Sequence, residues 1–161
     1  MKIDKRTVLA ALRARLAEDI AMMSRLALEA AEAASHEENK PENDKDMRST
    51  EASYVARGQA ERARDLERAH ALLGSMAARD FEPEDAIAIG ALVELRHRET
   101  VSVCLLVPAG GGTRARVEGV EVQAVTPTSP LGAALLGLSE GDEAEVRTPQ
   151  GTKVYEVMSV Q

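Results

Sequence analysis

The residues best suited to chemistry are carboxylates, which gather in the polar stretch between residues 37 and 51. Three basic side chains there leave a net charge of −3 against six acidic ones, which are Glu37, Glu38, Glu42, Asp44, Asp46 and Glu51. Carboxylate oxygens are the ligands that hard divalent cations prefer. A calcium loop that begins at Glu42 is excluded, because Met47 stands where the loop needs glycine and Ser53 where it needs glutamate.

Other catalytic arrangements are missing from the sequence. His36, His70 and His97 are scattered and lack the spacing of a helical zinc pair, so we expect them at the surface. The glycines at 110–112 have no following lysine and predict a hairpin turn rather than a phosphate site. Cys104 lies among apolar residues and predicts a buried small hydrophobe. With no nucleophile–base pair, we expect a protein that is not an enzyme by itself.

The first half of the chain predicts two long helices. Apolar or small residues recur at steps of three and four, which is typical of one buried helix face. The two stripes are Leu9, Leu12, Leu16, Ile20, Met23, Ala27, Ala30 and Ala34, then Ala52, Ala56, Gln59, Ala63, Leu66, Ala69, Leu73 and Met76. Pro41 interrupts the polar stretch between them, and Ser49 or Thr50 is expected to cap the second helix. Residues 1–80 therefore predict an antiparallel coiled-coil hairpin with an acidic tip near 37–51.

The second half changes to a period of two and to β-branched residues. We predict strands over 91–96, 101–107, 114–125, 144–147 and 153–160. A short helix over 130–136 is expected to begin at Pro130 and to be closed by Gly137. Residues 81–88 are expected to form a linker and residues 89–161 a small β-rich domain, so the predicted fold class is α+β.

Composition narrows the possible functions. The chain has 161 residues, 44% of them hydrophobic and 29% charged, and this balance predicts a folded protein. A net charge of −7 and 2% aromatic residues argue against unaided binding of nucleic acid. One cysteine excludes an intramolecular disulfide. No basic-then-apolar leader and no long apolar run is present, so we expect a cytoplasmic protein that does not contact membranes.

Four segments near the C-terminus match a known pattern in wording and spacing. They are SPLGAALLG at 129–137, GD at 141–142, TPQG at 148–151 and VYEV at 154–157. This run resembles the C-terminal domain of the GreA/GreB family of bacterial transcript-cleavage factors. Members of that family have a long N-terminal coiled-coil hairpin followed by an FKBP-like α+β domain, the architecture expected above on separate grounds.

The resemblance implies an accessory factor of RNA polymerase. In this family the C-terminal domain docks at the mouth of the polymerase secondary channel, and the hairpin enters towards the active centre. Tip carboxylates there help to hold a Mg²⁺ ion of the polymerase, which itself cleaves the backtracked transcript. The resemblance thus implies a transcription elongation factor with no cofactor of its own, which meets nucleic acid only within the polymerase complex. We expect it to be a monomer.

The tip departs from the family pattern, which reads like GDLSENAEY. Residues 43–54 read NDKDMRSTEASY; if Tyr54 matches the family tyrosine, Glu51 falls one residue out of step with the family glutamate. We therefore take Asp44 and Asp46 as the principal candidates for the shared Mg²⁺, with Glu42 and Glu51 in reserve.

A second departure lies in residues 114–124, which lack the acidic stretch that the family often uses to contact the polymerase. An apolar surface around Pro130, Leu131 and Leu135 remains the candidate polymerase contact, with Leu135 and Leu136 expected in the core.

Two other hypotheses remain open at this point. The altered tip is also compatible with a Gfh-like inhibitor, which enters the same channel without stimulating cleavage. Alternatively, the coiled coil is a plain interaction module that dimerises into a four-helix bundle or binds another partner.

Overall fold

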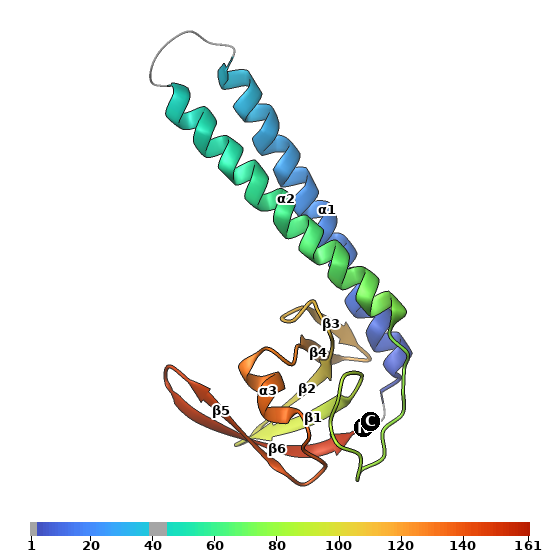
Figure 1. Cartoon of the computed structure of the whole chain (residues 1–161). Coiled ribbons are helices and arrows are strands. Elements are labelled where there is room, and N and C mark those ends of the chain that lie inside the picture. The colour runs from blue at the N-terminus through green and yellow to red at the C-terminus, as the bar shows by residue number, and fades with distance from the viewer. Residues whose placement is uncertain (1–2, 39–44) are drawn as a thin grey trace. The chain divides into compact units, whose positions relative to one another are not determined.

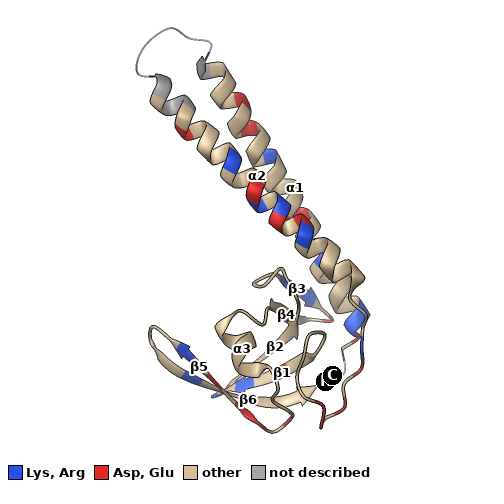
Figure 2. Cartoon of the chain, in the orientation of Figure 1, with Lys and Arg blue, Asp and Glu red and all other residues tan. Residues whose placement is uncertain are grey.

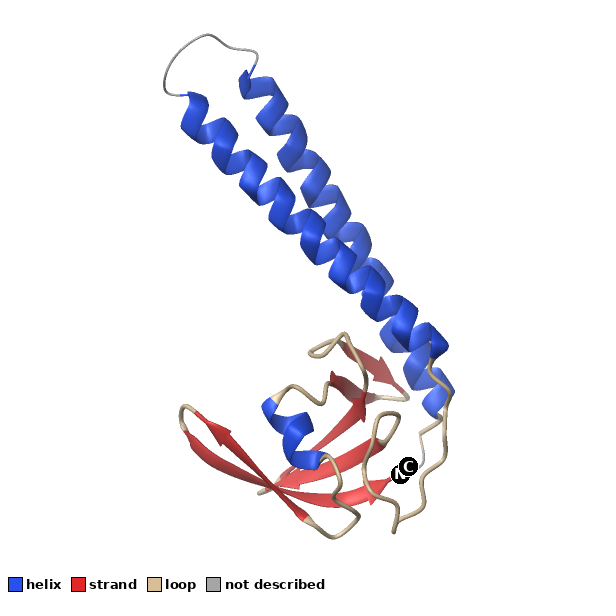
Figure 3. Cartoon of the chain, viewed as in Figure 1, coloured by secondary structure: helices blue, strands red, loops and turns tan. Residues whose placement is uncertain are grey.

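The computed structural model describes residues 3–38 and 45–161. The chain begins with two long helices, α1 (Lys5–Glu38) and α2 (Lys45–Ser75), and continues into a six-stranded sheet with one short helix (Figures 1 and 3). It divides into two compact units, one of Leu16–Arg68 and the other of Met1–Arg15 with Ala69–Gln161. The predicted α+β class, with an N-terminal helical hairpin and a β-rich domain, is confirmed.

Within the unit of Leu16–Arg68, α1 and α2 run antiparallel and side by side (Figure 1). Within this unit the predicted stripes form the seam between the helices, since all of their residues from Leu16 to Ala34 and from Ala52 to Leu66 are buried or half-buried. Leu16 and Leu66 are large, whereas towards the tip the seam is made mostly of alanine, with Ala34 and Ala63 buried. Hydrophobic burial per turn, and the stabilisation that follows from it, is therefore smaller in the distal part of this unit.

The helices extend further into the polar stretch than predicted. α1 continues to Glu38 and α2 begins at Lys45, so the expected cap at Ser49 or Thr50 is wrong and both residues are helical. No residue from Lys45 to Ser49 breaks a helix, which lets α2 begin earlier. Pro41, the predicted break, lies outside the described residues.

The cap of α1 is Asp4, which the apolar pattern of the sequence does not predict. Its carboxylate accepts hydrogen bonds from the Thr7 hydroxyl at 2.7 Å, the Thr7 amide at 3.1 Å and the Arg6 amide at 3.2 Å. These bonds, with the Thr7 hydroxyl contributing most, lower the pKa of Asp4 because they favour the charged carboxylate.

The sheet has the strand order β3-β4-β2-β1-β6-β5. Its strands are β1 (Leu92–His97), β2 (Thr100–Leu106), β3 (Arg114–Val117), β4 (Val120–Val125), β5 (Glu143–Thr148) and β6 (Gly151–Val160). Strands β2 and β4 are parallel, and the other neighbours are antiparallel. The single strand predicted over 114–125 is wrong: Glu118 and Gly119, with φ of 51° and 85°, form a two-residue turn that folds it into a hairpin.

The core of the domain lies on one face of the sheet. Val93, Leu95, Cys104 and Leu106 pack there with Leu135 of the short helix α3 (Pro130–Leu135). Cys104 is buried as predicted, and burial raises the pKa of its thiol to about 12. The expected linker of residues 81–88 contributes Phe81 and Ile87 to this core.

Lys5 in the first turn of α1 is 7% exposed and tethers that helix to the segment before β1. Its ammonium group donates hydrogen bonds to the carbonyl oxygens of Arg79 and of Gly90, the latter at 3.2 Å, and lies 4.7 Å from the centroid of the Phe81 ring. Burial lowers the pKa of Lys5 below 10.5, because desolvation disfavours the charged form.

We expect Lys5→Met to lower the free energy of unfolding at pH 7 by about 2 kcal/mol, because two carbonyl groups lose a buried donor. The unfolded wild type holds the Lys5 proton up to pH 10.5, whereas the folded form releases it earlier. Between those two pKa values, the wild type should therefore gain stability relative to the variant as the pH rises. Urea unfolding from pH 7 to 10.5 measures both effects; equal stability at pH 7 would contradict the tether.

Candidate functional site

The predicted tip carboxylates are only partly placed by the structure. Glu42 and Asp44 lie outside the described residues, and Asp46 lies in the first turn of α2 with its side chain undescribed. Glu51 is on α2 and exposed to solvent. The described residues thus bring no two of these carboxylates together, and among them no group of three metal-capable side chains is found.

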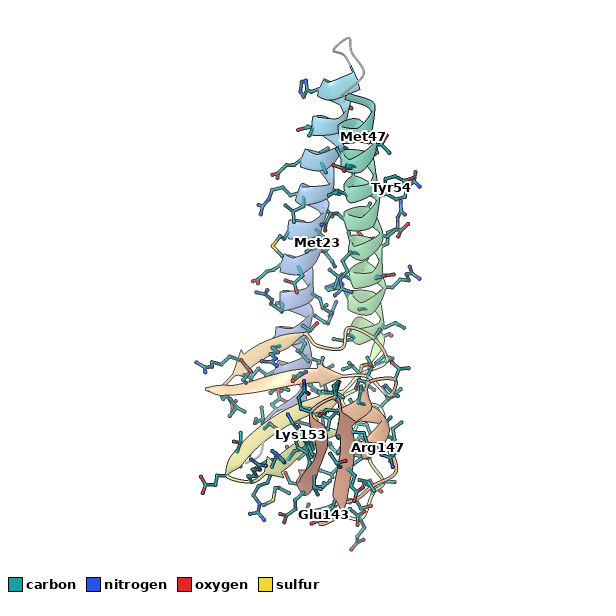
Figure 4. All side chains as sticks on the ribbon, turned by 90° about the vertical axis from the view of Figure 1, so that its left-hand side faces the viewer. Met23, Met47, Tyr54, Glu143, Arg147 and Lys153 are labelled. Carbon is teal, nitrogen blue, oxygen red and sulfur yellow. The ribbon has the colours of Figure 1, made fainter. Side chains whose placement is uncertain are left out.

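Two large apolar side chains flank Glu51 on α2. Met47 is 76% exposed and Tyr54 is 67% exposed, and Figure 4 shows both on this helix. At positions i, i+4 and i+7, Met47, Glu51 and Tyr54 lie on one face of the helix. Figure 2 shows that charges of both signs occupy the helix surface elsewhere along α2. The family resemblance matches Tyr54 to a family position but assigns no role to Met47.

The predicted contacts Pro130 and Leu131 lie together at the start of α3. They line a hollow of about 520 Å³, here called the α3 groove, with the glycine turn before β3, the end of β4 and Val146 of β5. Pro130 is exposed, whereas Leu131 is half-buried and packs against the core. No charged side chain belongs to the described lining of the groove, so it suits an apolar contact.

Ser129 and Gly132 shape the α3 groove. The Ser129 hydroxyl accepts a hydrogen bond from the Gly132 amide at 3.1 Å and donates one to the Thr126 carbonyl oxygen at 2.8 Å. Ser129 is thereby the N-cap of α3, and Pro130 occupies the first helical position, where its missing N–H has no cost. Gly137, with φ of 82°, follows the end of α3 as predicted.

Gly132 packs so closely on the loop after β4 that no side chain fits. A Cβ atom there would overlap the Thr126 carbonyl oxygen and lie 2.7 Å from its carbon. On the other side of the groove, a Cβ on Gly111 would meet the Thr126 methyl group at 3.0 Å. The sequence motif contained Gly132, but its spacing alone gave no reason for a glycine at that position.

The sequence predicts surface positions for all three histidines. His36 is exposed, as predicted. His70 and His97 are half-buried, and the His97 ring nitrogen Nδ1 lies 2.7 Å from the Val154 carbonyl oxygen. No described helix has the length and apolar character needed to cross a membrane.

The helical hairpin, the sheet and the capped α3 helix together define an α+β protein with an apolar groove beside α3. Residues 82–161 match the family described as "Transcription elongation factor, GreA/GreB, C-term". By these residues the chain belongs to the GreA/GreB family, as the sequence motifs predicted.

Two curated relatives illustrate the match. The chain is 28% identical over 100 residues to the transcription elongation factor GreA of Acinetobacter baumannii, covering 62% of this chain and 61% of the relative. It is 37% identical over 82 residues to GreA of Anaeromyxobacter sp., covering 47% and 43% respectively. The chain thus spans about half the length of these relatives. Among solved structures, Gfh1 of Thermus aquaticus is 20% identical, with a TM-score of 0.39 and coverage of 94% and 95%.

Proposed function

We propose that this protein is an elongation factor that binds RNA polymerase, enters its secondary channel with the helical hairpin and stimulates cleavage of backtracked transcripts. The observation that carries the proposal is the α3 groove, because residues within the family match build this hollow, whose described lining has no charged side chain, and expose Pro130 beside it. The hairpin supplies a slender element whose tip sequence is rich in carboxylates.

The chemistry belongs to the polymerase in this proposal. A second metal ion stabilises the attacking and leaving oxygens of the hydrolysis, and Mg²⁺ accepts one or two protein carboxylates while keeping waters. Asp44 and Asp46 are proposed as the residues that supply this oxygen, with Glu42 and Glu51 in reserve. The protein needs no metal of its own and acts as a cytoplasmic monomer.

The test adds the protein to halted, backtracked elongation complexes with Mg²⁺ and follows RNA length. Shortened transcripts that resume elongation are the expected result. Slower nucleotide addition without shortening would instead favour a Gfh-like inhibitor, which the irregular acidic spacing of the tip also permits. No binding to the polymerase would reject both, and sedimentation of the free protein as a dimer would then favour the plain coiled-coil module.

Docking through the α3 groove can be tested apart from cleavage. We expect Pro130→Glu to weaken polymerase binding about tenfold or more, because a carboxylate in an apolar contact loses its hydration. The fold should persist, since an acidic residue is favourable in the first turn of a helix. Ala133→Glu places the same charge at an exposed position of α3 outside the groove lining and should bind like the wild type. Equal binding by Pro130→Glu would remove the groove from the contact.

A further inference from the structure

The sheet carries a second apolar surface on the face opposite the core. Along β2, Cys104 and Leu106 point into the core, so the alternating residues Val101, Val103 and Leu105 point to the other face. All three are apolar, where a solvated face normally carries polar residues. The sequence pattern therefore predicts that other elements bury both faces of this strand.

Among the described residues, that cover is complete at only one end of the strand. Leu105 is fully buried and Val103 is half-buried, but Val101 is 54% exposed. The parallel neighbour β4 shows the same change in burial along its length: Val122 is fully buried and Val120 is half-buried. The apolar stripe thus runs on from the covered end into a surface that no described element covers completely.

At its uncovered end the stripe opens into a hollow of about 620 Å³, here called the outer hollow. Glu94 of β1 and Glu121 of β4 belong to its lining, and neither lysine nor arginine does among the described residues. Glu121 also pairs with Arg114 at 3.3 Å, an exposed contact. Ser159, opposite Glu94 in the β1–β6 register, lines the hollow too, and its Oγ is buried without a described hydrogen-bond partner. With two carboxylates and neither lysine nor arginine in its described lining, the rim of the hollow favours a cationic group.

We propose that the outer hollow is a docking site for an amphipathic, basic α-helix of a protein partner. A helix is the element that packs on the face of a sheet, whereas a strand would need a free edge. The hollow draws residues from β4, β2, β1 and β6, four adjacent strands that span about 14 Å. That distance corresponds to about nine helical residues. Leucine-like side chains would cover Val101, Val103 and Val120, and lysine or arginine would meet Glu94 and Glu121.

This site is separate from the α3 groove, with which it shares no lining residue. It goes beyond the proposed function because it specifies a second partner segment by its chemistry. A negative result for cleavage or for polymerase binding would therefore not contradict binding at the outer hollow.

The test titrates the ¹⁵N-labelled full chain with a helix-forming peptide of about twelve residues that carries leucine on one face and lysine on its flanks. Expected are amide shifts confined to residues 92–94, 101–103, 120–121 and 159–161. Two matched peptides, one with glutamate for lysine and one with serine for leucine, should bind at least about tenfold more weakly.

Variants then locate the contact. Val101→Asp should weaken the lysine peptide about tenfold, whereas Val154→Asp, at an exposed valine of β6 outside the hollow, should leave binding unchanged. Glu94→Gln should reduce both affinity and its dependence on salt. If the spectrum of Val101→Asp shows unfolding, Val101→Ser replaces it. Absence of shifts, shifts confined to the α3 groove, equal binding of the glutamate peptide or an unchanged Val101 variant would overturn the proposal.

Discussion

Replacing Gly132 by alanine is expected to lower the free energy of unfolding of the sheet domain by about 3 kcal/mol, a large fraction of the stability of a small domain. The added Cβ overlaps the carbonyl oxygen of Thr126 and also meets Ser129 Oγ at 3.1 Å. Since the nearest atoms belong to backbone, relief requires α3 or the loop after β4 to move. Alanine is the better helix former by about 1 kcal/mol, which is too little to offset the overlap.

The same substitution at Gly58 provides the control. Gly58 lies within α2, and a Cβ there meets nothing within 4 Å. We expect Gly58→Ala to raise stability by about 0.5–1 kcal/mol, since the helix propensity then acts alone. Urea unfolding monitored by circular dichroism compares the two variants. A Gly132→Ala protein as stable as the wild type would mean that α3 is not fixed against Thr126 as described.

Loss of transcript shortening is the second large effect, expected when Asp44 and Asp46 are both changed to alanine. If these carboxylates supply oxygen ligands to Mg²⁺ in the polymerase, their removal should slow cleavage by at least about a hundredfold. Polymerase binding should persist, because no residue of the α3 groove is altered. The measurement is RNA length against time in backtracked complexes, with binding measured in parallel.

Asp65→Ala is the matched control for the tip variant. Asp65 is a surface carboxylate of α2 that pairs with Arg68 at 2.8 Å and lies well outside residues 37–51. Its removal should leave cleavage unchanged. Full cleavage by the Asp44/Asp46 double variant would contradict their assignment, and the reserves Glu42 and Glu51 would be examined next.

The elements could largely be predicted from sequence because their periods are distinct. The three/four stripe from Leu9 to Ala34 specified α1, and the alternation in β2 specified a strand. Two details escaped for local reasons. The cap at Asp4 depends on hydrogen bonds to Thr7 that no apolar pattern reports. The turn at Glu118 and Gly119 is only two residues long. Valines lie directly on either side of it, Val117 and Val120, so the sequence resembles one continuous strand.

The site was predictable to a smaller degree. The SPLG motif predicts Pro130 and Leu131 as contact residues. The glycine turn before β3 and Val146 line the same groove through tertiary packing, which sequence spacing does not encode. The outer hollow does not follow from the sequence, because the alternation in β2 predicts a strand but not how much of each face other elements cover. Its apolar outward residues, Val101 and Val103, were the available signal.

If the hairpin enters the polymerase channel as proposed, the alanine seam between its helices has a geometric consequence. Small side chains let two helices approach at the short end of the usual range of about 8–10 Å between axes, so the paired rod stays narrow. Leucine at Ala56 or Ala30 would add hydrophobic burial and at the same time push the axes apart. Greater hydrophobic burial and a thin cross-section therefore place opposite demands on these positions, and alanine meets the second demand.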